Sequence, residues 1–510
     1  MNANILLGND ARPPTHSRSP IGQLTPTGQV LRAEVPLRQF PSTVVGIGVH
    51  KIFRTSLFFS RRKRDVLITH RYRRAEVAVL PVCGRNKSEP HSVFQYSGSL
   101  SNRTLWSVSY FYTGEFMKIV NVEHHIIHPT KAAETSYHNY AKGKNLCFVK
   151  IETDDGIDGW GECYTQADRD IQVTAHIDQL KRYLIGRDPR HIKHFLQMSF
   201  DDFGARRGAM DLYSAVSGLE QAMWDILGKS CDLPVHMLLG GPCRDKVRVY
   251  ANGWGGGSWD ENEVAEQARK IVDLGFTALK FDPVPGPWRT FVDKTIEKQT
   301  VKNVQAVREA VGPDIDILIE MHRRLAPMHA VRIAREMEQF EPFWYEEPVL
   351  AENINALAAA KKEINIPVVT GEELYTKFEF REMFEKDAAD IINPDVCNVG
   401  GILELKEIAA MAEPYFVAVS PHNYNSTTIG LAATLQVSAA IPNFLITEYF
   451  INFQEMGREI ATDQFDVQDG YIQVPTAPGL GTSLDETALA EFPYQEFPMR
   501  NLRSYSDEGP

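Results

Sequence analysis

The chain has 510 residues, of which 43% are hydrophobic and 24% are charged, a composition typical of soluble globular proteins with two or three domains. No uninterrupted apolar stretch reaches the length of a membrane span. The six cysteines form no CxxC pair and lie at positions 83, 147, 163, 231, 243 and 397. This scatter argues against a disulfide framework or a zinc site and favours reduced thiols in the cytoplasm.

The net charge of -12 is unevenly distributed. Residues 1–116 contain 16 Lys and Arg against 6 Asp and Glu, include the run RRKRDVLITHRYRR (61–74), and show no sustained helical or strand periodicity. Four interpretations of this segment are open: a disordered tail, an organelle transit sequence, translated sequence upstream of the true start, and an arm that binds nucleic acid. No methionine occurs between Met1 and Met117, where a clean alternating strand begins. We therefore favour a dispensable, disordered basic extension over residues 1–116.

From about residue 247 the chain alternates short apolar strands with amphipathic helical segments. Segments such as 328–340 and 401–415 carry apolar residues at three- and four-residue spacing, as one-sided helices require. The eight strand candidates are VRVYANG, ALKFD, DILIE, FWYEEP, VVTGEE, DIINPD, VAVSPH and LITEYF. With seven helices between them and no proper helix after the last, they predict a (β/α)7β TIM-like barrel. An open doubly wound sheet is the main alternative, disfavoured by the even repeat and the missing Gly-rich turn.

Polar residues stand at the end of nearly every predicted barrel strand. They follow one another at intervals of 26, 26, 23, 27 and 26 residues and are Glu320, Glu346, Glu372, Asp395, His422 and Glu448. An interval of one β/α unit brings each group to the C-terminal rim of a barrel. A single acid at a strand end commonly caps the next helix. Three carboxylates in phase, with Lys280 and His322 at matching positions, instead indicate an all-oxygen site for a hard divalent cation, most plausibly magnesium.

Several longer motifs accompany these residues. They are DGIDGWGE (155–162), SGLEQAMWDILGK (217–229), EMHRRLAPM, WYEEP, GEELYTKFEF, IINPDVCNVGG, AVSPHNYNSTTIGLA and APGLG (477–481). Together they resemble the enolase superfamily, specifically its mandelate racemase-like branch and the acid-sugar dehydratases within it, most closely the galactonate dehydratases. The resemblance covers about 117–500. It implies an α/β fold in which a barrel (245–465) carries an N-terminal α+β capping domain (117–244), completed by a C-terminal segment (466–510).

Carried over by position, the resemblance implies that Glu320, Glu346 and Glu372 are the ligands of one Mg²⁺ per subunit. The first ligand is more often Asp in the dehydratases, so the longer side chain of Glu320 is a departure that either shifts the metal slightly or needs a compensating shift elsewhere.

The resemblance also implies a His–Asp dyad, in which His422 removes the proton next to a carboxylate and Asp395 holds the imidazole tautomer. Glu448 matches an acid that helps to hold the reacting carboxylate. His322 lies two residues beyond Glu320, so strand alternation directs it into the same cavity. We expect it to act as a general acid on a departing hydroxyl, with support of the metal ligand as the alternative.

Lys280 comes from the opposite side of the barrel. Many relatives have Lys-x-Lys here, whereas this chain has Lys280-Phe-Asp282, and we expect Asp282 to pair with Lys280 and hold it cationic. This favours an electrostatic clamp for Lys280 over a second base. Substrate choice is expected in the cap loops 135–145 and 199–211, through His138, Arg206 and Arg207 together with Asp282.

The resemblance therefore implies a Mg-dependent dehydratase that converts a sugar acid, such as galactonate or gluconate, into a 2-keto-3-deoxy acid through an enediolate. An epimerase, racemase or cycloisomerase and a low-activity metabolite-binding protein are the alternatives. We expect a small-molecule sugar-acid substrate, no nucleic-acid or membrane partner, assembly into a homo-oligomer and a cytoplasmic location.

Overall fold

The computed structural model forms two compact units, Met1–Glu115 and Phe116–Pro510. In the first unit it describes the strands at 55–59, 66–72, 75–79, 93–100 and 104–111. In the second it describes residues 116–129, 144–166, 168–206, 208–255, 260–286, 289–424 and 426–496.

The first unit contains two antiparallel sheets. One has the order β1 (Thr55–Phe59), β2 (Val66–Tyr72), β3 (Ala75–Val79), and the other pairs β4 (Val93–Leu100) with β5 (Thr104–Phe111). These strands lie in the segment for which we expected no regular structure. Their sequences, such as VLITHRY and TLWSVSYF, are rich in β-branched and aromatic residues, which favour strands even where strict alternation is missing.

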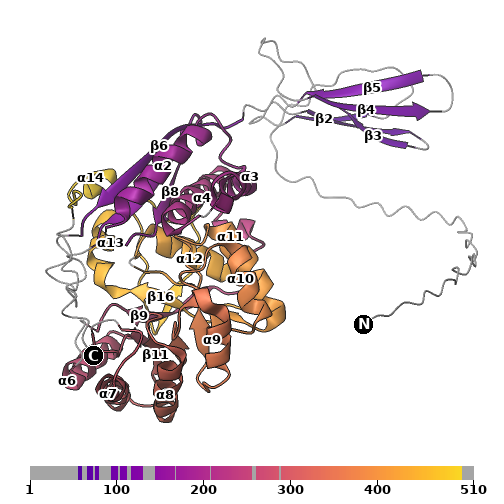
Figure 1. Ribbon diagram of the computed structural model, residues 1–510. Coiled ribbons are helices and arrows are strands. Elements are labelled where there is room, and N and C mark those ends of the chain that lie inside the picture. The colour runs from indigo at the N-terminus through magenta and orange to yellow at the C-terminus, as the bar shows by residue number, and fades with distance from the viewer. Residues whose placement is uncertain are drawn as a thin grey trace, which may run out of the picture. The chain divides into compact units, whose positions relative to one another are not determined.

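The second unit begins with the capping domain (Figure 1). Its antiparallel sheet has the order β6 (Ile119–Ile127), β7 (Leu146–Thr153), β8 (Asp158–Cys163). The helices α2 (Asp170–Leu184), α3 (Ile192–Met198), α4 (Met210–Cys231) and α5 (Val235–Leu238) follow. Glycines explain how closely α4 packs on β8: a Cβ atom at Gly161 would lie 1.8 Å from the carbonyl oxygen of Gly218. A larger residue at Gly161, in the first quoted cap motif, or at Gly218, in the second, would therefore push α4 away from β8.

Eight parallel strands of the described chain form the barrel. They pair in order from the first to the seventh, and the eighth pairs with the first. The backbone N–H of Val419, in the seventh strand, donates to the carbonyl of Asn443 at 2.9 Å, just before the eighth, so the sheet closes. The strands are β9 (Lys246–Asn252), β10 (Ala278–Phe281), β11 (Asp316–Glu320), β12 (Trp344–Glu346), β13 (Val368–Thr370), β14 (Ile391–Ile392), β15 (Ala418–Val419) and β16 (Thr447–Phe450).

One helix follows each of the first seven strands and covers the outside of the barrel (Figure 1). Side chains of Asp260 and Asp293 cap the first two helices by accepting backbone N–H groups. The helices are α6 (Glu261–Asp273), α7 (Lys294–Val311), α8 (Pro327–Met337), α9 (Ile354–Lys361), α10 (Thr376–Glu385), α11 (Ile402–Ala412) and α12 (Ile429–Ala440). The predicted (β/α)7β barrel is confirmed. A short helix, α13 (Gln454–Ile460), does follow the eighth strand, where we expected none.

The C-terminal segment returns to the cap, as predicted. Strand β17 (Tyr471–Gln473) pairs with the start of β9. The backbone N–H of Gly479 then donates to the carbonyl of Leu233 at 3.0 Å, and the N–H of His128 donates to the carbonyl of Phe492 at 3.1 Å. These contacts tie the C-terminal segment to the residue that follows β6 and to the turn between α4 and α5 of the cap.

Two buried glutamates of the cap bind the N-terminal ends of barrel helices. Glu220, on α4, accepts the backbone N–H groups of Ile402 at 2.7 Å and Leu403 at 2.9 Å, at the start of α11. Glu162, on β8, accepts the N–H of Gly430 at 2.8 Å, in the first turn of α12. The first N–H groups of a helix have no partner within the helix, so by accepting them these glutamates fix the cap over the barrel.

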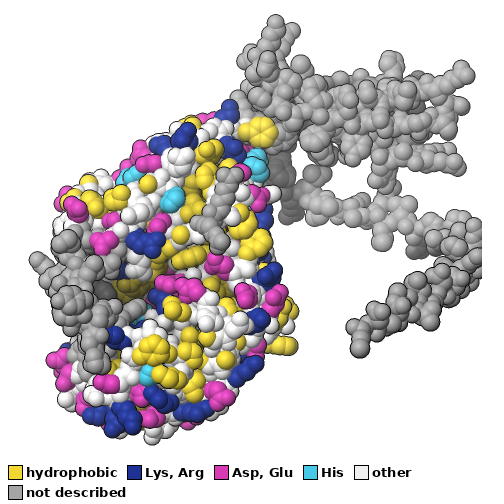
Figure 2. Space-filling model, viewed as in Figure 1, with side chains coloured by type: hydrophobic (Ala, Val, Ile, Leu, Met, Phe, Trp, Pro, Cys, Tyr) yellow, Lys and Arg dark blue, Asp and Glu magenta, His cyan; other side chains and the backbone are white. Residues whose placement is uncertain are grey.

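Within the described residues, no helix is long and apolar enough to cross a membrane. The five described cysteines are all free thiols, consistent with the absence of a disulfide framework. On the face shown in Figure 2, acidic, basic and hydrophobic side chains are interspersed over both cap and barrel.

Candidate active site at the C-terminal rim of the barrel

The side chains predicted at the strand ends meet at one rim. Glu320 and Glu346 are the last residues of β11 and β12, and Glu448 lies in β16. Glu372, Asp395 and His422 stand two or three residues after β13, β14 and β15. Because all of these strands are parallel, this is the C-terminal rim, where barrel enzymes carry their chemistry.

Glu320, Glu346 and Glu372 form a compact carboxylate triad. Each offers one oxygen, and these oxygens lie within 4.8 Å of one another. The three residues are only 2%, 0% and 6% exposed. Burial and the charge of Glu320 raise the pKa of Glu346 well above its usual range even though Lys280 lies beside it, which indicates that three negative charges at the triad need more positive charge than Lys280 supplies. An all-oxygen, acidic and buried donor set of this kind fits a hard divalent cation.

Two basic residues supply positive charge to the triad. The Nζ atom of Lys280 lies 2.7 Å from Oε1 of Glu346 and 3.4 Å from Oε2 of Glu320. The same Nζ lies 3.6 Å from Glu448, and although burial opposes the charged form, these acids raise the pKa of Lys280 well above its usual range. The guanidinium of Arg323 binds Glu372.

The expected pairing of Asp282 with Lys280 is wrong. Asp282 instead binds Nδ1 of His322 at 2.8 Å and the guanidinium of Arg324. Strand β10 ends at Phe281, so the period-2 alternation that would have placed Asp282 beside Lys280 does not extend to it. Lys280 is held cationic by Glu320, Glu346 and Glu448, which lie on other strands of the barrel, rather than by Asp282.

His322 lies at the same rim, but in a turn that follows the end of β11. Its backbone has a φ of 46°, in the left-handed region, and its N–H donates to Oε1 of Glu320 at 2.7 Å. The imidazole is half-buried and is oriented by Asp282. His322 is therefore brought to the triad by a turn after β11, and not by strand alternation as we assumed.

His422 and Asp395 form the expected pair. Nδ1 of His422 lies 2.7 Å from Oδ2 of Asp395, which leaves Nε2 facing Glu372 at 3.2 Å and Glu448 at 3.4 Å. Burial lowers the pKa of His422, but the charges of Glu448 and Glu372 and the hydrogen bond with Asp395 outweigh it and raise the pKa to about 10. The imidazole thus points its second nitrogen at the triad.

Comparison with known proteins assigns the chain to a family. Residues 116–240 match the N-terminal domain of the mandelate racemase/muconate lactonizing enzymes, and residues 263–488 match the enolase C-terminal domain-like family. The chain is also 34% identical over 361 residues to D-galactonate dehydratase of Variovorax paradoxus, covering 70% of this chain and 93% of the relative. This chain belongs to the mandelate racemase/muconate lactonizing enzyme family of the enolase superfamily.

Other relatives agree with this assignment. D-gluconate dehydratase of Thermoproteus tenax is 34% identical over 346 residues, 68% of this chain and 69% of the relative. The crystal structure of a mandelate racemase/muconate lactonizing enzyme from Sulfitobacter sp. superposes with a TM-score of 0.68 at 33% identity, covering 76% of this chain and 99% of that one. The predicted resemblance to the mandelate racemase-like branch is confirmed.

The rim of this enolase-superfamily member also contains residues that sequence reasoning missed. Asn393 donates to Oε1 of Glu346 at 2.9 Å, and Trp344 donates to its Oε2 at 2.9 Å. Asn393 lies in the quoted motif IINPDVCNVGG, just after strand β14, and Trp344 precedes Glu346 by two residues. Both positions follow from strand alternation and strand ends, so the same signal that located the carboxylates would have found them.

An aromatic wall stands beside His422. The ring centroid of Tyr424 lies 6.0 Å from the imidazole, and that of Tyr164, at the end of cap strand β8, lies 6.2 Å away. Phe450 packs edge-on against Tyr424 at 4.9 Å. The cap also supplies Lys144, whose Nζ lies 3.3 Å from the Tyr424 ring centroid. No pattern in the sequence places Lys144 at the rim, because its position depends on how the cap closes over the barrel.

The expected substrate contacts of the cap are only partly described. His138 and Arg207 lie outside the described residues, as does the side chain of Arg206. Their roles stay predictions. The segment 199–211, which we expected to be a loop, contains a π-helical turn (Ser199–Phe203) and a 3₁₀ turn (Gly204–Arg206) before α4 begins at Met210.

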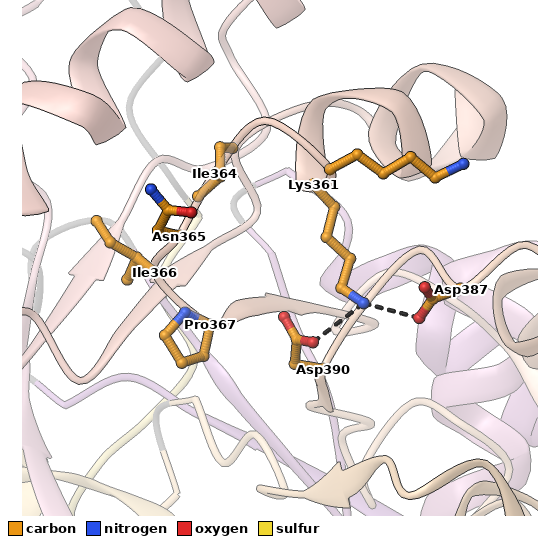
Figure 3. A pocket seen from close by; sticks show the side chains of 8 residues that line it. Lys361, Ile364, Asn365, Ile366, Pro367, Asp387 and Asp390 are labelled. Carbon is orange, nitrogen blue, oxygen red and sulfur yellow. Dashed lines mark hydrogen bonds and ion pairs between the residues drawn. The ribbon is translucent and has the colours of Figure 1, made fainter.

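A shallow hollow lies at the end of the barrel opposite the triad, and Figure 3 shows side chains that line it. It opens between the ends of α9 and α10 and the starts of β13 and β14, and it is lined by Lys361, Lys362, Ile364, Asn365, Ile366, Pro367, Asp387 and Asp390. The Nζ of Lys361 binds Asp387 at 2.7 Å and Asp390 at 3.0 Å. The charges at the centre of the hollow are therefore paired with one another. The hollow lies at the N-terminal rim, where the residues of a barrel contribute to stability.

Proposed function

We propose that this chain is a magnesium-dependent sugar-acid dehydratase, a hydro-lyase that converts an aldonate into a 2-keto-3-deoxy acid. The observation that carries the proposal is the convergence of the carboxylate triad, the His422–Asp395 pair and Lys280 at one rim. Relatives named D-gluconate dehydratase and D-galactonate dehydratase support the choice of reaction and substrate class.

Glu320, Glu346 and Glu372 would hold the cation, since together they supply three buried carboxylates. A proton next to a carboxylate is a very weak acid, because its removal creates a doubly charged enediolate. When bound, Mg²⁺ would neutralise the charge that develops on the substrate carboxylate. Lys280 would add a second positive charge to the same carboxylate. Its contacts with three acids keep it protonated, which favours the clamp over the base.

His422 is the proposed general base. Asp395 binds Nδ1, so Nε2 is the nitrogen that faces the triad and would accept the α-proton. Neutralisation of Glu372 would remove one of the charges that keep His422 protonated, and the pKa would fall towards the range that a base needs. Asp395 would then stabilise the imidazolium that forms.

His322 is the proposed general acid. After the α-proton leaves, the electron pair expels the β-hydroxyl, which takes a proton from His322 and departs as water. The resulting enol takes up a proton at the β-carbon and becomes the 2-keto-3-deoxy acid. The hydrogen bond to Asp282 would hold the imidazole in place for this transfer.

The test is a screen of six-carbon aldonates, including D-gluconate and D-galactonate, with Mg²⁺ and detection of 2-keto acids. We expect one or more acids to give product, and we expect a chelator to stop the reaction and Mg²⁺ to restore it. The absence of 2-keto acid from every aldonate, with a protein that binds Mg²⁺ and is folded, would contradict the proposal. Epimers of the starting acid would favour the racemase or epimerase alternative.

A further inference from the structure

Lys144 is a buried basic residue whose Nζ atom contacts the face of the Tyr424 ring. It lies two residues before β7, in the cap, and is only 5% exposed. Among the described residues, its Nζ atom has no hydrogen-bond partner. The contact with the Tyr424 ring recovers only about 0.5–2 kcal/mol, less than the several kcal/mol that a buried ammonium without a hydrogen bond typically costs, so the stability of the fold does not explain the position.

The surroundings of Lys144 place it at the active rim. Its Nζ lies over the ring of Tyr424, which stacks against His422. Burial lowers the pKa of Lys144 well below its usual range, and the charges of Glu372 and Glu448 oppose that shift. Neither acid makes an ion pair with it in the described chain, in contrast to Lys280, which contacts three acids.

The geometry points to a substrate oxygen as the missing partner. We propose that Lys144 is a substrate-binding residue that donates hydrogen bonds to the hydroxyl oxygens beyond the β-carbon of the sugar acid. This rests on the proposed function, because it takes the carboxylate of that acid to lie at the triad and Lys280. Lys144 comes from the cap and stands on the His422 side, so the part of the substrate it meets is the polyhydroxy tail.

The experiment compares Lys144→Met, Lys144→Arg and the wild type, with Lys118→Met as a control because Lys118 is exposed in the same domain. The readouts are kcat/KM for a six-carbon aldonate, the inhibition constant of glycerate, Mg²⁺ affinity and Tm. Glycerate carries the carboxylate and the β-hydroxyl but no hydroxyl beyond the β-carbon.

We expect Lys144→Met to lower kcat/KM for the six-carbon acid about 10- to 100-fold, the usual effect of losing a hydrogen bond from a charged group. Glycerate inhibition and Mg²⁺ affinity should stay unchanged, and Tm should stay or rise, since Met leaves no buried hydrogen-bond donor unpaired. Lys144→Arg should retain more activity than Lys144→Met, and Lys118→Met should match the wild type.

An unchanged kcat/KM in Lys144→Met would overturn the inference while leaving the proposed function intact. Equal losses towards glycerate and the six-carbon acid would also overturn it, because they would place Lys144 at the reacting carboxylate. A lower Tm together with weaker Mg²⁺ binding would show a structural role. If the wild type converts no aldonate, the proposed function itself fails, and the variants are not needed to see it.

Discussion

The Nζ atom of Lys280 lies 2.7 Å from Oε1 of Glu346. The two residues come from β10 and β12, on either side of the strand that ends in Glu320. One lysine thus bridges two members of the carboxylate triad, in the position from which it would also reach a carboxylate bound at that triad. The pair is the centre of the proposed site.

Replacing Glu346 or Glu372 with Gln should abolish Mg²⁺-dependent activity. Each change removes the charge of a proposed ligand with little change of shape, so the loss should exceed the roughly 10- to 100-fold effect of outer-shell partners. The Tm of the metal-free protein should not fall, because repulsion among the three carboxylates is relieved. Titration calorimetry with Mg²⁺ and rates at limiting Mg²⁺ provide the measurement.

The matched control is Glu347→Gln. Glu347 is adjacent in WYEEP, but its Oε1 accepts the backbone N–H of Gly371 and the residue lies outside the triad. This variant should bind Mg²⁺ as the wild type does. Full activity of Glu346→Gln or Glu372→Gln at limiting Mg²⁺ would rule out the ligand assignment.

The base and the acid can be separated by exchange of the α-proton with solvent deuterium. His422→Asn should stop both dehydration and exchange. His322→Asn should stop dehydration but permit exchange, because the enediolate still forms and returns. Loss of a general acid or base typically costs about 10²–10⁴ in rate. If His422→Asn keeps exchange while Lys280→Met loses it, Lys280 is the base and the epimerase alternative becomes the better account.

A chain that begins at Met117 should be as active as the full-length protein. Residues 1–115 and 116–510 form separate compact units, and the first segment carries the opposite net charge from the rest of the chain. We expect equal kcat and equal Tm of the main unfolding transition. Aggregation, or loss of Mg²⁺ binding, would show that the extension is needed by the catalytic unit.

The interface of cap and barrel should weaken as the pH rises. Burial raises the pKa of Glu220 to about 8, although Leu403, Ile402 and Trp224 donate hydrogen bonds to it. An unfolded glutamate has a pKa of about 4.3, so the folded state binds the proton more tightly. This contribution to stability is complete below about pH 4 and is lost as the pH approaches 8, by up to about 1.4 kcal/mol per unit.

Glu220→Gln cannot ionise, so it provides the comparison. Between pH 5 and pH 8 the Tm of the wild type should decline more steeply than that of Glu220→Gln, as measured by calorimetry at several pH values. Parallel Tm curves for the two proteins would show that Glu220 keeps the same protonation state across this range.

Much of the fold and of the rim could be predicted from the sequence, because both follow from local patterns. Eight strands, nearly all with a polar residue near the end, are visible in the order of residues, and parallel pairing then brings Glu320, Glu346 and Glu372 together. The pairing of Asp282 was wrong because strand alternation was extended one residue past the end of β10. Lys144 could not be found, because its burial depends on a contact between cap and barrel that no local pattern encodes.

The most direct test of the central claim is the reaction itself, run with D-gluconate, D-galactonate and other six-carbon aldonates in D₂O with Mg²⁺ and followed by NMR. Dehydration through an enediolate predicts a 2-keto-3-deoxy acid that carries one solvent deuterium at C3, since the β-carbon takes up a proton when the enol collapses. No 2-keto acid from any aldonate, or recovery of the starting acids and their epimers with deuterium at C2 alone, would contradict the assignment of this chain as a sugar-acid dehydratase.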